Sequence, residues 1–220
     1  MKQNFKLLIA AMTMLFFRSI AMAQIPVEVF AGDKKATVDI LFFRFIKNKE
    51  GHNSNILFFN RNRAGIDYKM TKTTNLPQFG FTEALSYNHE KLKGFALVAV
   101  VSILNKGVFP KAGVQYAKTK KSYSLFTWLV SETIKDPNID FFLLARYSPK
   151  LTDKLSLFSQ LELVNAFPTA VQNNFSFTQR FRLGLKTGNF QFGAGIDLSE
   201  LGRKDYTNTI NAGGFLRYEF

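Results

Sequence analysis

The sequence has no cysteine, one tryptophan and no long uninterrupted hydrophobic run. Without cysteine, a disulfide framework, a thiolate metal site and a cysteine nucleophile are all excluded. The lack of cysteine also suits passage through an oxidising periplasm. The longest apolar stretch, from Phe95 to Leu104, is about half as long as a membrane-spanning helix needs to be. The chain is therefore not a helical membrane protein.

Acidic residues are also scarce: the chain has 16 of them and 29 lysines and arginines, so the formal net charge is +13. The basic residues are spread through expected turns and strands rather than gathered on one face, and this argues against nucleic-acid binding. Basic turns instead suit anionic headgroups. We therefore expect outer-membrane lipid and lipopolysaccharide as partners, and no nucleic acid.

Histidine is nearly absent, and His52 and His89 lie far apart without the spacing of metal ligands. No glycine-rich phosphate loop of recognisable form is present. The run His52-Asn53-Ser54-Asn55 superficially resembles the His-x-Ser-Asn element of lipid A deacylases. That family carries the element late in a smaller barrel, whereas here it falls in an early turn. We expect no catalytic residues, no metal site and no cofactor, and therefore a protein that is not an enzyme.

The start of the chain has the features of an export signal. Two lysines precede an apolar stretch over residues 7–17, and Ala21-Met22-Ala23 forms a small-x-small cleavage site. This pattern predicts a secretory signal peptide over residues 1–23. The remainder, residues 24–220, shows no domain boundary or repeat and is expected to form one β-barrel domain.

Phenylalanine is abundant, with 25 residues, and it recurs with the two-residue period of a β-strand. Over residues 175–185, phenylalanine and leucine occupy one face while arginine, threonine and serine occupy the other. The segments 190–199 and 210–220 alternate in the same way. In a membrane barrel the apolar face meets lipid and the polar face lines the lumen. This alternation predicts such a barrel.

Turn residues divide the chain into twelve expected strands, and ten strands is the alternative. An even number places both ends of the chain on the periplasmic side. The predicted fold class is therefore all-β: a single antiparallel transmembrane up-and-down β-barrel. The expected strands cover residues 25–31, 36–47, 54–69, 78–88, 94–105, 111–118, 123–134, 139–148, 154–166, 174–186, 190–199 and 206–220.

The last residues carry an aromatic pair, Tyr218 and Phe220, shortly after Gly213 and Gly214. They resemble the C-terminal signal of bacterial outer-membrane β-barrel proteins. This resemblance implies recognition by the barrel-assembly machinery and a place in the outer membrane of a Gram-negative bacterium. The size and strand number also resemble 12-stranded small-solute channels of the nucleoside-channel type. The Phe-, Lys- and Asn-rich composition resembles outer-membrane proteins of the Bacteroidetes.

The alternation assigns several charged and amide side chains to the lumen. Arg180 and Arg182, two residues apart on one strand, are the foremost candidates for contact with a solute, with Arg146, Glu162 and Asp197 as further candidates. Two interpretations stay open: a polar channel, or ion pairs that fill a narrow barrel. The full lumen set is Asp39, Arg44, Asp140, Arg146, Gln160, Glu162, Arg180, Arg182, Gln191, Asp197, Arg217 and Glu219.

Glu83 breaks the pattern because it shares its face with Phe79, Phe81, Leu85 and Tyr87. An ionisable group on the lipid face points to a function such as a protein–protein contact in the membrane. A β-bulge that turns Glu83 inward is the favoured alternative.

Two functions follow from these patterns. The first is a passive pore for small polar solutes with a weak preference for anions. The second is a non-enzymatic barrel subunit of an envelope secretion, assembly or surface-attachment complex. The sequence names neither the solute nor the partner proteins.

Overall fold

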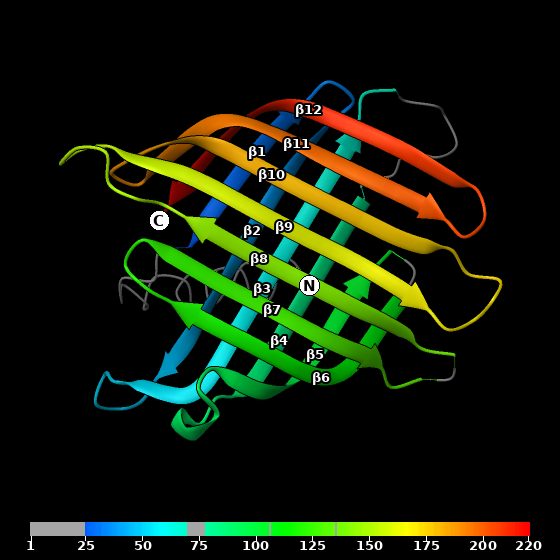
Figure 1. The fold of residues 1–220 in the computed structure, drawn as a ribbon, viewed down its shortest axis with the longest axis horizontal. Helices are drawn as coiled ribbons and strands as arrows, with labels where there is room; N and C mark the ends of the chain where they lie inside the picture. The colour runs from blue at the N-terminus through cyan, green and yellow to red at the C-terminus, as the bar shows by residue number, and fades with distance from the viewer. Residues whose placement is uncertain (1–24, 70–77, 106, 135) are drawn as a thin grey trace, which may run out of the picture.

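The computed structural model describes residues 25–69, 78–105, 107–134 and 136–220. In these ranges, twelve antiparallel strands close into one barrel, and the first strand pairs with the last (Figure 1). Closure leaves no strand edge with unpaired backbone groups, a condition that a sheet in lipid must meet. The prediction of a 12-stranded up-and-down barrel is confirmed. The expected signal peptide lies outside the described residues.

Most strands end within two residues of their expected bounds. The main differences are β6, which begins at Gly107, and β11, which continues to Gly202. Both extend past expected turn residues because the neighbouring strand continues to offer backbone partners. The strands are β1 (Pro26–Gly32), β2 (Lys35–Lys47), β3 (Asn53–Asp67), β4 (Gln78–Tyr87), β5 (Phe95–Leu104), β6 (Gly107–Thr119), β7 (Tyr123–Glu132), β8 (Asn138–Tyr147), β9 (Ser156–Pro168), β10 (Phe175–Thr187), β11 (Phe190–Gly202) and β12 (Tyr206–Glu219).

The first and last described residues meet at one end of the barrel, which we call the terminal end. Ile25 and Phe220 exchange two backbone hydrogen bonds, each 3.2 Å long. The opposite end, where β1 turns into β2, is the far end. A short 3-10 helix, η1 (Glu90–Leu92), joins β4 to β5 at the terminal end. No helix within the described ranges is long and apolar enough to cross a membrane.

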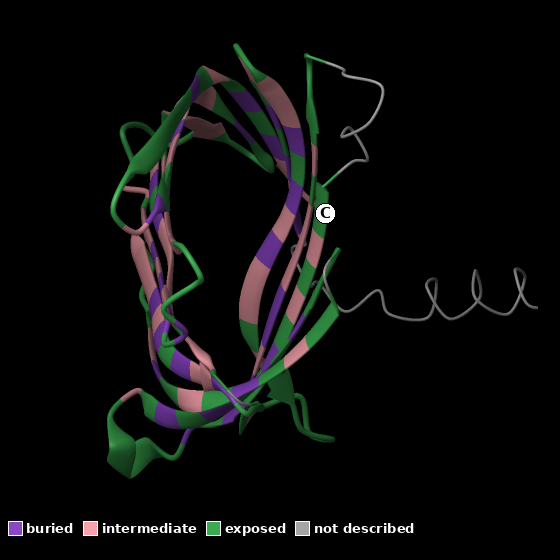
Figure 2. Ribbon diagram, turned by 90° about the vertical axis from the view of Figure 1, so that its right-hand side faces the viewer, coloured by how far each residue is buried: buried purple, intermediate pink, exposed green. Residues whose placement is uncertain are grey.

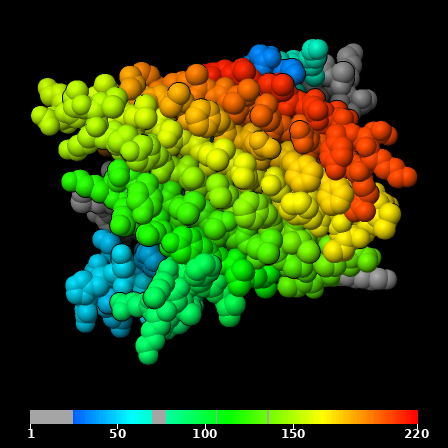
Figure 3. All heavy atoms as spheres, in the orientation of Figure 1, coloured from blue at the N-terminus to red at the C-terminus, as the bar shows by residue number. Residues whose placement is uncertain are grey.

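The outer surface is apolar because alternate residues of every strand point away from the lumen. On β5, the outward Leu97 is 75% exposed, whereas the inward Val98 is 4% exposed. Figure 2 shows the resulting bands of buried and exposed residues around an oval ring. In Figure 3, outward side chains from β6 to β12 cover one side of the barrel completely. An apolar exterior of this kind is the surface that a lipid-embedded barrel presents.

The interior has two unlike halves, and this corrects the expectation of a polar lumen throughout. Charged and amide side chains occupy the inner side of β1 and β9–β12 and reach β2 and β3. The inner side of β4–β8 is apolar at mid-height, with Val98, Val100, Phe126, Trp128 and Phe142 buried. It is polar toward the far end, where the buried Lys111 pairs with Glu132 and with the predicted lumen residue Asp140. Both faces of β5 are therefore apolar, which accounts for its uninterrupted apolar sequence. A filled interior behaves as a protein core, where apolar side chains are favoured.

Candidate functional site

The polar half of the lumen consists of one large bonded network and a smaller group, Lys186, Gln191 and Glu219, at the terminal end. Most of its charged groups have a partner. Arginines outnumber lysines in it, and the planar guanidinium lets each arginine contact two carboxylates at once. The members of this polar half are Glu28, Asp39, Arg61, Arg63, Arg146, Gln160, Glu162, Arg180, Arg182, Lys186, Gln191, Asp197, Arg217 and Glu219.

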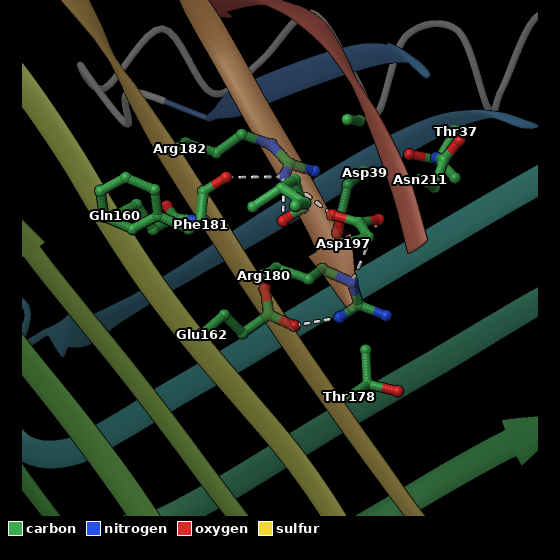
Figure 4. Close-up of polar contacts among 12 residues, drawn as sticks. Thr37, Asp39, Gln160, Glu162, Thr178, Arg180, Phe181, Arg182, Asp197 and Asn211 are labelled. Carbon is green, nitrogen blue, oxygen red and sulfur yellow. Dashed lines mark hydrogen bonds and ion pairs between the residues drawn. The ribbon is translucent and has the colours of Figure 1, made fainter. Parts of the chain in front are cut away.

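Asp197 on β11 is the centre of the polar half. Its carboxylate accepts from Arg63 at 2.9 Å and from Arg182 at 2.8 Å, and it lies 3.6 Å from Arg180. The side chain is 2% exposed. Such burial of a charge is tolerated only when ion pairs and hydrogen bonds compensate the lost water. Figure 4 shows Arg180 and Arg182 reaching toward this carboxylate from the neighbouring strand β10.

Glu162 on β9 links opposite walls of the barrel. Arg61 on β3 lies 2.7 Å from its carboxylate, and Arg180 donates a hydrogen bond to it. Arg61 also donates to Asp39 at 3.0 Å. Because β3 and β9 are six strands apart in the closed order, the Arg61–Glu162 pair crosses the lumen.

The Arg182 guanidinium contacts a carboxylate, a backbone oxygen and an aromatic ring. It donates to Glu28 at 3.0 Å and to the backbone oxygen of Phe181 at 3.0 Å. Its guanidinium lies 3.9 Å from the ring centroid of Phe30, within the range of a cation–π contact. A Cβ at Gly195 would lie 2.6 Å from the Arg182 side chain, so the glycine makes room for it.

Two further arginines converge on Gln160. Arg217 donates to Gln160 at 3.0 Å and to Glu28 at 2.5 Å. Arg146 on β8 donates to Gln160 at 2.7 Å and to the backbone oxygen of Leu41 at 3.1 Å. Since β8 and β2 are also six strands apart, Arg146 forms a second bridge across the lumen. Arg146 is thus bound by neutral oxygens rather than by a carboxylate.

The rest of the cross-section is closed by packed rings, among them Phe43, Phe59, Phe126 and Phe142, which we call the aromatic half. The ring centroids of Phe43 and Phe59 each lie 4.9 Å from that of Phe126, and Phe59 lies 5.5 Å from Phe142. These contacts join β2 and β3 to β7 and β8, strands that are not neighbours in the sheet. Aromatic pairs at such distances contribute about 0.5–1.5 kcal/mol each beyond their burial. The two walls therefore meet through packed rings.

Little space remains between the charged side chains at mid-height. A cavity of about 10 Å³ is lined by Glu28, Asp39, Arg180 and Arg217, among others. One oxygen of Asp39 and the Nε atoms of Arg180 and Arg217 are buried without a hydrogen-bond partner, although the Arg180 Nε lies 3.6 Å from Asp197. The space holds about one water molecule, which these atoms would bind. Among the described residues, the lumen is thus closed in this conformation by side chains.

Polar groups nevertheless continue from the network to both ends of the barrel. At the terminal end, Glu219 accepts from Lys186 and from Gln191, each at 2.6 Å. At the far end, the hydroxyls of Thr178 and Ser199 lie 3.4 Å apart beyond Asp197. The polar half therefore extends along the whole barrel on one side of the lumen.

The structure brings the five predicted lumen residues into one region. Glu162, Arg180, Arg182 and Asp197 share ion pairs, and Arg146 joins them through Gln160. Their contact with a solute stays a prediction. Arg44 was wrongly assigned to the lumen: it points outward, with its guanidinium 5.2 Å from the Phe42 ring.

Sequence reasoning missed Glu28, Arg61 and Arg63. On β3, Arg61 and Arg63 share a face with the buried Leu57 and Phe59, so an assignment based on apolar side chains places that face toward lipid. The signal that could have found them is cross-strand charge, because Asp39 lies opposite Arg63 in the register of β2 and β3.

The terminal aromatic residues lie on the outer face. The rings of Tyr218 and Phe220 pack edge to face at 4.7 Å, and Phe190 contacts Tyr218 at the same distance. Phe220 is 70% exposed, so it remains accessible at the terminal end. Their role as an assembly signal stays a prediction.

Glu83 points outward, and the favoured β-bulge is wrong. The pairing of β4 with β3 and β5 is continuous, with Glu83 opposite Asn60 and Val101. A bulge is unnecessary because Asn60, which also points outward, donates to the Glu83 carboxylate at 3.2 Å.

The two histidines take part in local contacts at the terminal end. His52 lies in an exposed turn, 3.6 Å from Glu50. His89 caps η1, where its Nδ1 atom accepts a hydrogen bond from the backbone of Lys91 at 3.2 Å.

No known protein family matches this chain, and no curated protein matches it by sequence. Several solved barrels resemble it in structure. A KdgM porin in complex with disordered oligogalacturonate gives a TM-score of 0.48 at 11% identity and covers 90% of this chain and 99% of its own. The NanC porin gives 0.46 at 9% identity, covering 89% and 99%. The β-domain of the Bordetella autotransporter BrkA gives 0.37 at 9% identity, covering 90% and 100%. These identities are too low to transfer a solute or a residue role.

Proposed function

We propose that this protein is a narrow passive pore for small polar solutes in the outer membrane of a Gram-negative bacterium. The observation that carries the proposal is the polar half of the lumen, which runs from one end of the barrel to the other. It is interrupted at mid-height only by contacts between side chains. Side-chain rotations take place far faster than backbone rearrangements, so this closure is reversible.

The ion pairs provide a route for opening. Arg61 lies between Asp39 and Glu162, and Arg180 lies between Glu162 and Asp197. Each arginine can release one carboxylate while it retains the other, so no buried charge is left without a partner. This matters because an uncompensated buried charge costs about 3–5 kcal/mol. A small polar solute or ion would occupy the space between the separated pairs.

The charges of the polar half favour anions weakly. Its cations outnumber its carboxylates by seven to five, and with the inward Lys111, Glu132 and Asp140 of the other wall the lumen still has eight cations to seven carboxylates. A lumen with excess arginine and lysine attracts anions. The cations of the polar half are Arg61, Arg63, Arg146, Arg180, Arg182, Lys186 and Arg217, and its carboxylates are Glu28, Asp39, Glu162, Asp197 and Glu219.

The proposal is tested with the purified protein in planar bilayers and in liposomes. We expect small, intermittent conductance steps, swelling of liposomes in small polar solutes, and a reversal potential displaced toward that of the anion. A protein that inserts as a folded barrel but gives neither conductance nor swelling would refute the pore.

Arg146→Gln is expected to remove most of the anion preference. Arg146 is bound by Gln160 and a backbone oxygen, so its charge is not neutralised by a carboxylate. Glutamine retains hydrogen-bonding capacity without that charge. The reversal potential in a salt gradient should therefore move toward zero, and an unchanged potential would show that Arg146 does not set the selectivity.

The second candidate function is a non-enzymatic barrel subunit of an envelope complex. The outward position of Glu83 favours it, because a pore has no need of a carboxylate on its lipid face. Co-purification in mild detergent tests this role. A barrel that stays a lone monomer, unchanged by crosslinking in cells, would count against it.

A further inference from the structure

The outer surface of the barrel has a groove where β7, β8, β9 and β10 lie side by side. Its volume is about 360 Å³, which falls within the range of ligand sites in proteins. The lining includes Leu125, Leu161 and Phe181, whose side chains point outward. Ala145 and Ser159 lie among these larger residues, and their small side chains leave the space open. This outer groove is part of the lipid-facing surface and is separate from the lumen.

The outer groove runs from the terminal end toward mid-height. Tyr123, the first residue of β7, and Tyr147, the last of β8, lie opposite each other and line the groove at the rim. Phe181, the central residue of β10, lines its other side. Aromatic residues are typical of the level at which lipid headgroups begin. An acyl chain of the leaflet at this end covers about 15 Å, half of the hydrocarbon core, so a lipid with one chain in the groove has its headgroup beside the two tyrosines.

A cluster of lysines lies beside the rim of the outer groove. We call these residues the rim lysines: Lys118, Lys120, Lys121, Lys150 and Lys154. All of them are exposed, and none has an ion pair with another described residue. Lys118 points outward near the end of β6, opposite the groove residue Leu125 in the register of β6 and β7. The others lie in the turn between β6 and β7 and in the loop between β8 and β9.

These two loops are joined at the terminal end (Figure 1). The backbone N–H of Ser148 donates to the backbone oxygen of Ser122 at 2.7 Å. Asp153 is the only acidic residue in the two segments 118–122 and 148–155. Positive charge is therefore concentrated where the outer groove opens toward the headgroups.

We propose that the outer groove binds one phospholipid with an anionic headgroup, from the leaflet that surrounds the terminal end. One acyl chain lies in the groove, and the phosphate lies between the rim lysines and the hydroxyls of Tyr123 and Tyr147. Neither hydroxyl has a hydrogen-bond partner among the described residues. Lysine binds phosphate as a point charge, and lysine clusters beside a membrane surface recognise anionic lipids. The site does not depend on whether the lumen conducts.

A headgroup with a net negative charge fits the rim lysines better than a zwitterionic one. A zwitterionic headgroup has its own ammonium group, which would lie among several lysines with only Asp153 nearby. Lipopolysaccharide also carries phosphates. It occupies the opposite leaflet when both ends of the chain lie in the periplasm, as expected for an even number of strands.

Native mass spectrometry of the full chain in detergent tests the site. We expect one molecule of palmitoyl-oleoyl phosphatidylglycerol to bind per barrel. It should bind about tenfold or more tightly than phosphatidylethanolamine with the same chains. Equal binding of the two phospholipids would overturn the proposal, and so would tighter binding of lipid A than of phosphatidylglycerol.

Ala145→Phe tests the groove, because the ring takes the space of the acyl chain while the rim lysines stay in place. The side chain faces lipid, so the variant should fold as the parent does. Ala99→Phe is the matched control, since it makes the same change on the outward face of β5, away from the groove. We expect the first variant to lower the affinity for phosphatidylglycerol by about tenfold or more and the control to leave it unchanged. An unchanged affinity for Ala145→Phe contradicts the proposal.

A pair of charge variants tests the headgroup contact. Lys120→Gln with Lys121→Gln should remove most of the preference for phosphatidylglycerol, a loss of about tenfold or more, whereas arginine at both positions should retain it. Lys47→Gln with Lys49→Gln removes the same charge from exposed positions at the same end but on the opposite wall, and should have no effect. If this control lowers the preference as much as the first pair, the attraction belongs to the basic end as a whole and the proposed site is wrong.

Discussion

Replacing Asp197 with asparagine should lower the free energy of unfolding by about 3–5 kcal/mol, the usual effect of breaking a buried ion pair from one side. Arg63, Arg180 and Arg182 all converge on this carboxylate. The asparagine side chain has nearly the same shape but no charge, so three buried guanidinium groups lose the anion they share. No other carboxylate among the described residues has ion pairs with three arginines.

Urea unfolding in lipid vesicles, followed by tryptophan fluorescence, measures this effect. Asp153→Asn serves as the control because it removes the same charge from an exposed turn between β8 and β9, and its unfolding curve should match that of the parent. Equal stability of the Asp197 variant and the control would mean that the network carries no net stabilisation.

Replacing Phe126 with alanine is expected to cost about 3–5 kcal/mol, as for other large-to-small changes in a packed core. The Phe126 side chain is fully buried, and its ring contacts Phe43 and Phe59 from the opposite wall. Truncation leaves a cavity between two sheet walls that backbone pairing holds in place. The cavity cannot collapse easily, which places the effect toward the upper end of this range.

The same unfolding experiment tests the aromatic half. Leu129→Ala is the control on the same strand, where the side chain points outward and is 50% exposed. It should cause a smaller loss because lipid chains fill the space that the removed atoms leave. If Leu129→Ala destabilises the barrel as much as Phe126→Ala, the aromatic half is not a packed core.

The C-terminal part of the fold could be predicted from sequence in detail. On β10, Phe181 and Leu183 point outward while Arg180 and Arg182 point inward, as the alternation indicates. The prediction succeeds there because the outer face is apolar and the inner face is charged. The two-residue period then shows both that the segment is a strand and which of its faces meets lipid.

The interior of β4–β8 could not be predicted in this way. Val98 and Val100 point inward and Leu97 and Val101 point outward, so both faces of β5 are apolar. Alternation identifies a strand in such a segment but does not say which face meets lipid. The aromatic half was missed for this reason.

Contacts across the lumen are also beyond the reach of a single sequence. Arg61 and Glu162 are about 100 residues apart in the chain, and their meeting depends on the oval cross-section and on the register of every strand between them. The two-residue alternation could place Glu162 in the lumen. It could not show that an arginine of the opposite wall lies within reach of the Glu162 carboxylate.

The most direct test of the closed lumen compares two charge-balanced double variants by single-channel conductance. Arg61→Ser with Glu162→Ser removes a pair that crosses the lumen. Lys111→Ser with Asp140→Ser removes a pair that joins β6 to β8 within one wall. We predict that the first raises the conductance several-fold and that the second leaves it unchanged. Equal conductance of the parent and both variants would contradict a lumen closed by side chains from opposite walls.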